Sequence, residues 1–136
     1  MTVGESLKSW LMDFNTDARR LKAVNTDLLS AKVEEFAIVK EPTVNRKSNV
    51  FGDEEVTAHY TLLARLPNDT ELDRVDNNSF GESIEAWIEE KNSNKEYPEI
   101  SGYTVTNVAV TTVFYAYETN EHNSVYQMTI ALQYEK

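Results

Sequence analysis

Apolar residues recur at helical spacing in two stretches of the chain. In the first, residues 2–14, apolar side chains fall three and four positions apart, at Val3, Leu7, Trp10, Leu11 and Phe14. Thr2 and Glu5 have the spacing of a capping box, in which each side chain bonds the amide of the other residue. The pattern predicts a helix that begins at Thr2 and ends near Asn15.

The second helical stretch covers residues 79–92. Its apolar residues form a single stripe, made of Phe80, Ile84, Trp87 and Ile88. Ser79 and Glu82 repeat the capping-box spacing. We therefore expect a helix that begins at Ser79, ends near Asn92 and uses Trp87 to anchor itself to a sheet.

Other stretches have the composition and alternation of strands. Residues 31–41 are rich in β-branched and aromatic side chains, and Pro42 is expected to end this strand because proline has no amide proton. Two-residue alternation predicts strands over 56–66, 102–117 and 125–134. The last two are expected to form an antiparallel hairpin with a bulge near Asn107.

The connections are polar. Residues 43–55 are expected to be a loop or a strand end that leads into a hairpin, and residues 67–78 a connection with at most a short helical turn. The resulting order is helix, strand, strand, helix, strand, strand. It predicts one α+β domain over residues 1–136, a single mostly antiparallel β-sheet with two main helices packed on one face.

Charge limits the choice of partner. The 136 residues include 23 acidic and 13 basic ones, a formal net charge of −10. Binding to DNA or to an anionic membrane depends on basic side chains, so neither is expected to bind this surface. The chain has no cysteine, which excludes disulfides and thiolate chemistry. Because no long apolar run or signal-peptide layout is found, we expect the protein to be made and kept in a cytoplasm.

Residues capable of catalysis are present, but not in catalytic patterns. Glu82, Glu85 and Glu89 fall on the polar side of the second predicted helix, where no burial is expected to raise a carboxyl pKa. His59 and His122 lack the spacing of metal ligands. No nucleophile elbow or phosphate-binding glycine loop is present. We therefore expect no enzymatic activity, and no catalytic, cofactor-binding or metal-binding residues.

Two other features are candidates for binding. Five tyrosines, at positions 103, 115, 117, 126 and 134, fall in the predicted final hairpin; cross-strand pairing is favoured over stacking on a base or sugar. Arg46 and Lys47 form a small basic cluster, either solvated or in contact with an acidic patch of a neighbouring subunit. Phe51, an apolar residue in a polar segment, either packs on the core of its own subunit or joins Arg46 and Lys47 in the contact with a neighbouring subunit. Arg46, Lys47 and Phe51 are the candidate subunit-interface residues.

Four segments resemble a known family. They are "EEFAIVKEP" (34–42), "SFGESIEAWIEEKN" (79–92), "VTNVAVTTVFYAY" (105–117) and "NSVYQMTIALQYEK" (123–136). They are similar to the small minor capsid or tail-completion proteins, of tail terminator type, in phages and prophages of Gram-positive bacteria. The resemblance implies an α+β subunit of a hexameric ring that caps the tail tube and docks to the head–tail connector. It implies no catalytic residues.

The partners implied are other copies of the chain, the tail-tube protein, the connector and DNA that passes through the lumen without specific binding. The implied location is the virion, at the head–tail junction. Strands 31–41 and 56–66 are the expected exposed edges between subunits. Two alternatives stay open: a peptide- or ligand-binding module that uses the tyrosine-rich hairpin or a groove beside Trp10, and a small enzyme that uses His59 with an acid.

Overall fold

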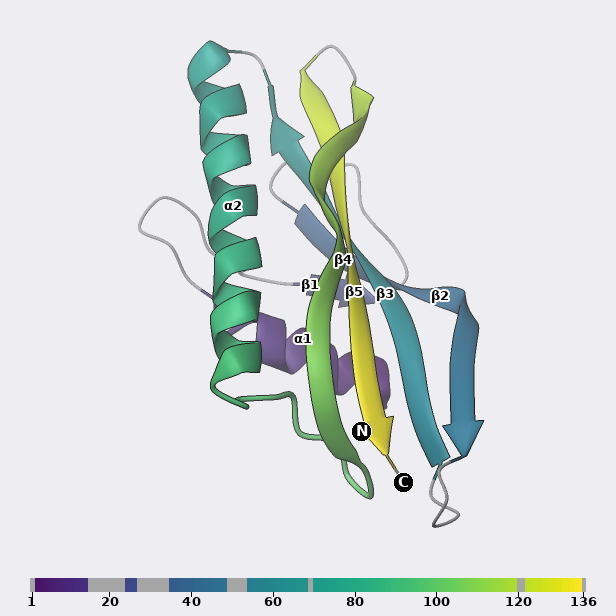
Figure 1. The fold of residues 1–136 in the computed structure, drawn as a ribbon. Helices are drawn as coiled ribbons and strands as arrows, with labels where there is room; N and C mark the ends of the chain where they lie inside the picture. Colours follow the sequence, from purple (N-terminus) through teal and green to yellow (C-terminus); the bar gives the residue numbers. More distant parts are fainter. Residues whose placement is uncertain are drawn as a thin grey trace.

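A five-stranded sheet forms the body of the protein. The computed structural model describes residues 2–14, 24–26, 35–48, 54–68, 70–119 and 122–135. Its elements follow in the order α1 (Val3–Leu11), β1 (Val24–Thr26), β2 (Glu35–Ser48), β3 (Glu54–Pro67), α2 (Glu71–Ser93), β4 (Thr104–Thr119) and β5 (Asn123–Glu135) (Figure 1). The strand order is β1-β2-β3-β5-β4, and every pairing is antiparallel except β1 with β2. The predicted α+β class and mostly antiparallel sheet are confirmed.

Both helices cover the same face of this sheet. Along β3, every second side chain from Val56 to Leu66 is buried. From Ala58 to Leu66, these side chains join one apolar cluster with residues of α1, such as Leu7 and Leu11, and of α2, such as Ile84 and Ile88. Truncating a fully buried leucine or isoleucine of this cluster, such as Leu62 or Ile84, to alanine should cost about 2–5 kcal/mol. Within the described residues, neither helix is long and apolar enough to cross a membrane.

The capping box at the start of α1 is present. The Glu5 amide donates to Thr2 Oγ1 at 3.1 Å, and the Thr2 amide donates to Glu5 Oε2 at 3.4 Å. The helix ends at Leu11 rather than near Asn15. Phe14 lies beyond the end of the helix, but its side chain is still buried in the core, with its ring centroid 5.7 Å from that of Phe80. Its apolar side chain therefore matched the helical period although its backbone is not helical.

Helix α2 is longer than the apolar pattern predicts. It begins at Glu71, eight residues before Ser79, so Ser79 and Glu82 lie inside the helix and form no cap. The additional turns are fixed by polar contacts to the end of β3. Buried Asn77 donates through Nδ2 to the Pro67 carbonyl at 2.8 Å, and Arg74 donates to the Asn68 carbonyl at 3.1 Å.

Pro42 does not end its strand. β2 continues to Ser48, and its register with β3 shifts between Lys40 and Val44. Proline is tolerated at such a bulge because no ladder donor is needed there. Residues 43–48 are therefore strand. Phe51 lies outside the described residues.

The expectation that strands 31–41 and 56–66 form the edges is only partly correct. β3, which contains residues 56–66, lies between β2 and β5 and is not an edge. Within the described residues, β1 pairs with β2 only at positions 36–38. The part of β2 that follows, up to Ser48, therefore lies at an edge of the sheet. The other edge strand is β4. Its register shifts four times, including the predicted bulge at Asn107, and such bulges blunt an edge against further pairing.

Candidate functional site

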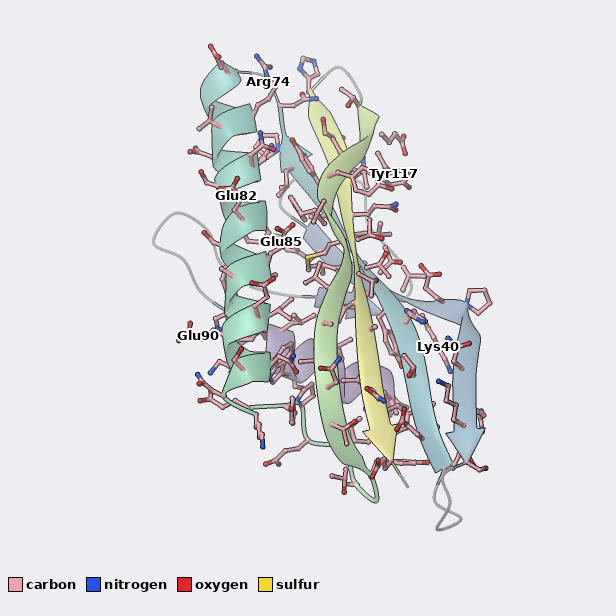
Figure 2. All side chains as sticks on the ribbon, in the orientation of Figure 1. Lys40, Arg74, Glu82, Glu85, Glu90 and Tyr117 are labelled. Atoms are coloured by element: carbon pink, nitrogen blue, oxygen red, sulfur yellow. The ribbon has the colours of Figure 1, made fainter. Side chains whose placement is uncertain are left out.

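The acidic side chains of α2 divide into two groups. Glu82 and Glu89 are exposed, as predicted. Glu85 is half-buried and turns toward β4, where its Oε1 accepts the Phe114 amide at 2.6 Å (Figure 2). The register shift between Thr112 and Tyr115 removes Phe114 from the ladder, so its amide needs another acceptor. The expectation that Glu85 lies on the polar side of the helix is wrong, and this contact links the helix to the sheet.

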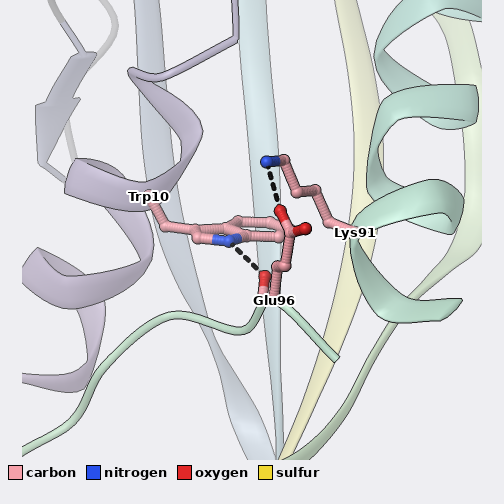
Figure 3. A network of polar contacts seen from close by, with 3 residues as sticks. All are labelled: Trp10, Lys91 and Glu96. Carbon is pink, nitrogen blue, oxygen red and sulfur yellow. Dashed lines mark hydrogen bonds and ion pairs between the residues drawn. The ribbon is translucent and has the colours of Figure 1, made fainter. Parts of the chain in front are cut away.

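Trp87 packs against the apolar cluster that the helices share with the sheet, and its ring contacts lie toward α1. Its ring centroid lies 4.8 Å from that of Trp10 and 5.6 Å from that of Phe14. Trp10 Nε1 donates to the Glu96 carbonyl at 2.9 Å, and the Glu96 carboxylate pairs with Lys91 Nζ at 2.6 Å (Figure 3). This hydrogen bond with Glu96 holds the pKa of Lys91 above its usual value. The cluster joins α1 to the end of α2.

The two histidines lie apart. His59 is half-buried in the middle of β3, opposite Ala131, whereas His122 is exposed at the end of the β4–β5 hairpin. No group of three or more potential metal-ligating side chains occurs among the described residues. The structure does not bring either histidine into a cluster of the kind that a metal site needs.

A groove lies on the covered face of the sheet beside the start of α1. Its cavity volume is about 310 Å³. The floor is apolar and aromatic. The lining residues of the sheet are Ile38, Lys40, Val44, Arg46, Ala58, Tyr60 and Tyr134, and the N-cap residue Thr2 completes the groove with Val3 and Gly4 of α1. We call it the basic groove, because the two charged side chains that line it are Lys40 and Arg46. Burial is the main cause that raises the pKa of Tyr134, and the Arg46 charge opposes it.

The structure separates the candidate interface residues Arg46 and Lys47. Both are exposed and both belong to β2, not to a loop. Arg46 lies in the basic groove, where its Nη1 is 3.0 Å from Glu54 Oε1 and its side chain remains 64% exposed. Lys47 is the next residue of the strand and therefore points to the opposite face, in register with Glu55.

A second groove runs beside Trp10, between α1 and residues 95–105. It is wide and open, with a volume of about 1020 Å³, and Tyr97 and Tyr103 line it. Ser6 also lines it, and its buried Oγ has no hydrogen-bond partner among the described residues. We call it the Trp10 groove. Its position agrees with the groove that the ligand-binding alternative requires.

The tyrosines of the final hairpin have different environments. Tyr126 is buried and stacked on Phe114 at 4.9 Å, and Tyr103 meets Tyr134 edge-on at 5.1 Å, so cross-strand pairing is confirmed for these. Tyr115 and Tyr117 are instead 40% and 52% exposed.

Val113, Tyr115 and Tyr117 occupy alternate positions near the end of β4, and Val113 is 63% exposed. Figure 2 shows Tyr117 beside the hairpin, on the side away from α2. We call these three residues the hairpin patch. Sequence reasoning noticed the tyrosines but missed their exposure, because that depends on the bulges in β4.

Comparison with known proteins gives no relative for this chain: no family model matches the sequence, and no curated protein matches it.

Proposed function

We propose that the chain is a structural subunit of a phage virion, a tail terminator or head–tail joining protein that forms a ring on the tail tube. The observation that carries the proposal is the hairpin patch. Val113, Tyr115 and Tyr117 are exposed close together on one strand, and contiguous exposed apolar patches often mark contacts with other macromolecules. The resemblance to phage tail-completion proteins is most specific at "AWIEEKN", residues 86–92 of α2.

The charge distribution supports the same role. Helix α2 contains seven acidic and two basic residues, a net charge of −5, which is half of the net charge of the chain. Exposed carboxylates, such as those of Glu82, Glu89 and Glu90, repel the phosphate backbone. In the proposed ring, this helix faces the lumen, and DNA passes without being held.

The partners of the proposed ring are the tail-tube protein and the head–tail connector. Two observations test this. A tail-tube or tape-measure gene next to the gene for this chain would support the proposal. Cosedimentation of the purified protein with tail tubes of the same phage should give saturable binding, and a protein that stays in the supernatant at every tube concentration contradicts it.

The role of the acidic helix has its own test. Replacing Glu82, Glu89 and Glu90 by lysine changes the formal net charge from −10 to −4, because each reversal adds two charges. All three side chains are exposed, so the fold should persist. We expect DNA ejection and infectivity to fall, with the corresponding glutamine variants as the control for loss of charge alone. Unchanged infectivity of the lysine variant refutes the lumen assignment.

The Trp10 groove favours a second candidate function, a binding module for a peptide or small ligand. Its open volume and its aromatic side chains suit a ligand that carries an apolar group. A nuclear magnetic resonance screen with short peptides tests it. Chemical-shift changes that concentrate at Ser6, Tyr97 and Tyr103 when peptide is added support this candidate. If the protein also fails to bind tail tubes, the binding module is favoured over the ring.

A further inference from the structure

We infer that the hairpin patch of one copy occupies the basic groove of the next copy. This inference rests on the proposed ring and specifies its subunit contact. The occupant of the groove is the segment of β4 that carries Val113, Tyr115 and Tyr117 of another molecule of the same chain.

The two surfaces are chemically complementary. The patch offers one aliphatic and two aromatic side chains, followed by exposed Glu118. The groove offers an apolar floor with Lys40 and Arg46, in a chain where acidic residues outnumber basic ones 23 to 13. An aromatic segment that ends in a carboxylate therefore fits this groove better than a neutral or basic one.

The size of the groove suits such a segment. A volume of about 310 Å³ is at the lower end of the range for binding pockets and accommodates a large side chain with part of its neighbours. Tyrosine is well suited to this role because it buries a large area and loses little conformational freedom. Arg46 already pairs with Glu54 but stays mostly exposed, so the carboxylate of Glu118 can approach it.

The positions of the two surfaces rule out a contact within one molecule. Tyr115 lies opposite Gln127 on β5, whereas Tyr134 of the groove lies seven residues further along the same strand, a separation of about 24 Å. Tyr117 also lies on the side away from α2, and the groove lies on the covered face. A contact between two different, oppositely directed surfaces is head-to-tail, and repeated copies of it close into a ring when the rotation per step allows.

Cysteine cross-linking tests the contact directly, because the natural chain has no cysteine. We choose Tyr117→Cys for the patch and Val44→Cys for the groove, since both changes keep the core intact. Mixed under mild oxidation, the two single variants should form a disulfide-linked dimer. The yield should be about tenfold higher than for Tyr117→Cys mixed with Ser83→Cys, a control at an exposed position of α2, because docking raises the effective concentration of the paired thiols. Equal yields for the two mixtures overturn the inference.

A chain that carries both Tyr117→Cys and Val44→Cys gives a second readout. The two sites are too far apart for a disulfide within one molecule, which needs Cα atoms within about 7 Å. The double variant should therefore form a ladder of covalent oligomers that stops at the ring size, and a monomer with an internal disulfide overturns the proposed geometry. Circular dichroism spectra like that of the natural chain show that each variant has folded.

The outcomes separate this contact from the proposed function. Binding to tail tubes without preferential cross-linking refutes the patch-in-groove contact and leaves the tail role standing. Preferential cross-linking in a protein that ignores tail tubes supports the contact and refutes the tail role. Failure of both assays refutes both.

Discussion

Replacing Gly81 by alanine is expected to destabilise the fold, against the usual preference of helices for alanine. Gly81 is buried where α2 approaches β4. An added Cβ would lie 2.4 Å from Cδ1, 2.8 Å from Cγ and 2.9 Å from Cβ of Phe114. The first contact involves the ring, but the last involves an atom that a side-chain rotation cannot move. The helix or the strand must therefore shift.

The expected magnitude follows from two opposing effects. Alanine in place of glycine within a helix gains about 1 kcal/mol. Overpacking a tight site costs about 1–3 kcal/mol or more. The higher end applies here, because Phe114 is stacked on Tyr126 at 4.9 Å and meets Phe80 at 5.7 Å, so its movement disturbs two ring contacts. We expect a net loss of about 2 kcal/mol in the free energy of unfolding.

Urea unfolding, followed by tryptophan fluorescence and circular dichroism, measures this loss. Gly4→Ala is the matched control, because Gly4 is also helical but its added Cβ would lie 3.5 Å from Tyr60 Cε1, an ordinary contact. The control should be neutral or stabilising by up to about 1 kcal/mol. If Gly81→Ala is as stable as the natural chain, the close packing of α2 on β4 is wrong.

Three further predictions concern contacts described above. Glu85→Ala removes the acceptor of the Phe114 amide and should lower the free energy of unfolding in urea by about 1–3 kcal/mol. The control Glu82→Ala, at an exposed position, should change it by less than about 0.5 kcal/mol. Equal effects of the two substitutions contradict the hydrogen bond to β4. Trp10→Phe loses the hydrogen bond to the Glu96 carbonyl and should cost about 1 kcal/mol or more, so an unchanged urea midpoint argues against the bond. The pKa of Tyr134 is raised in the folded protein. Its contribution to the free energy of unfolding is therefore complete below the unfolded-state pKa of about 10, and it is lost as the pH rises through the folded-state pKa. The stability difference from Tyr134→Phe should therefore change only in this alkaline range, and a change near neutral pH contradicts it.

Elements with a strong period could be predicted from the sequence. The capping box of α1 and the alternation of β3 and β5 are local signals, and each led to the correct element. The bulge at Asn107 was also predictable, because the apolar phase changes there.

The missed features depend on contacts between distant parts of the chain. The first turns of α2 are held by the bond from Asn77 to the end of β3, which no apolar period reveals. β2 passes through Pro42 because the register with β3 absorbs it in a bulge. Glu85 became a structural acceptor only because β4 leaves the Phe114 amide outside its ladder.

The candidate surfaces were predictable only in part. Arg46 was singled out from its charge, and the structure places it in a groove that combines α1, β2, β3 and β5. No local pattern brings these four elements together. The tyrosines of β4 were recognised, but which of them stay exposed depends on the irregular register of that strand.

Electron microscopy of tail-tube ends tests the central claim most directly. If the chain is the proposed tail subunit, tail tubes from its phage are incubated with the purified protein and imaged. We expect a closed ring of identical subunits at the tube end, with β4 of each subunit against the start of α1 in the next. Bare tube ends, together with a protein that keeps its monomer mass of 15.6 kDa in light scattering at every concentration, would contradict it.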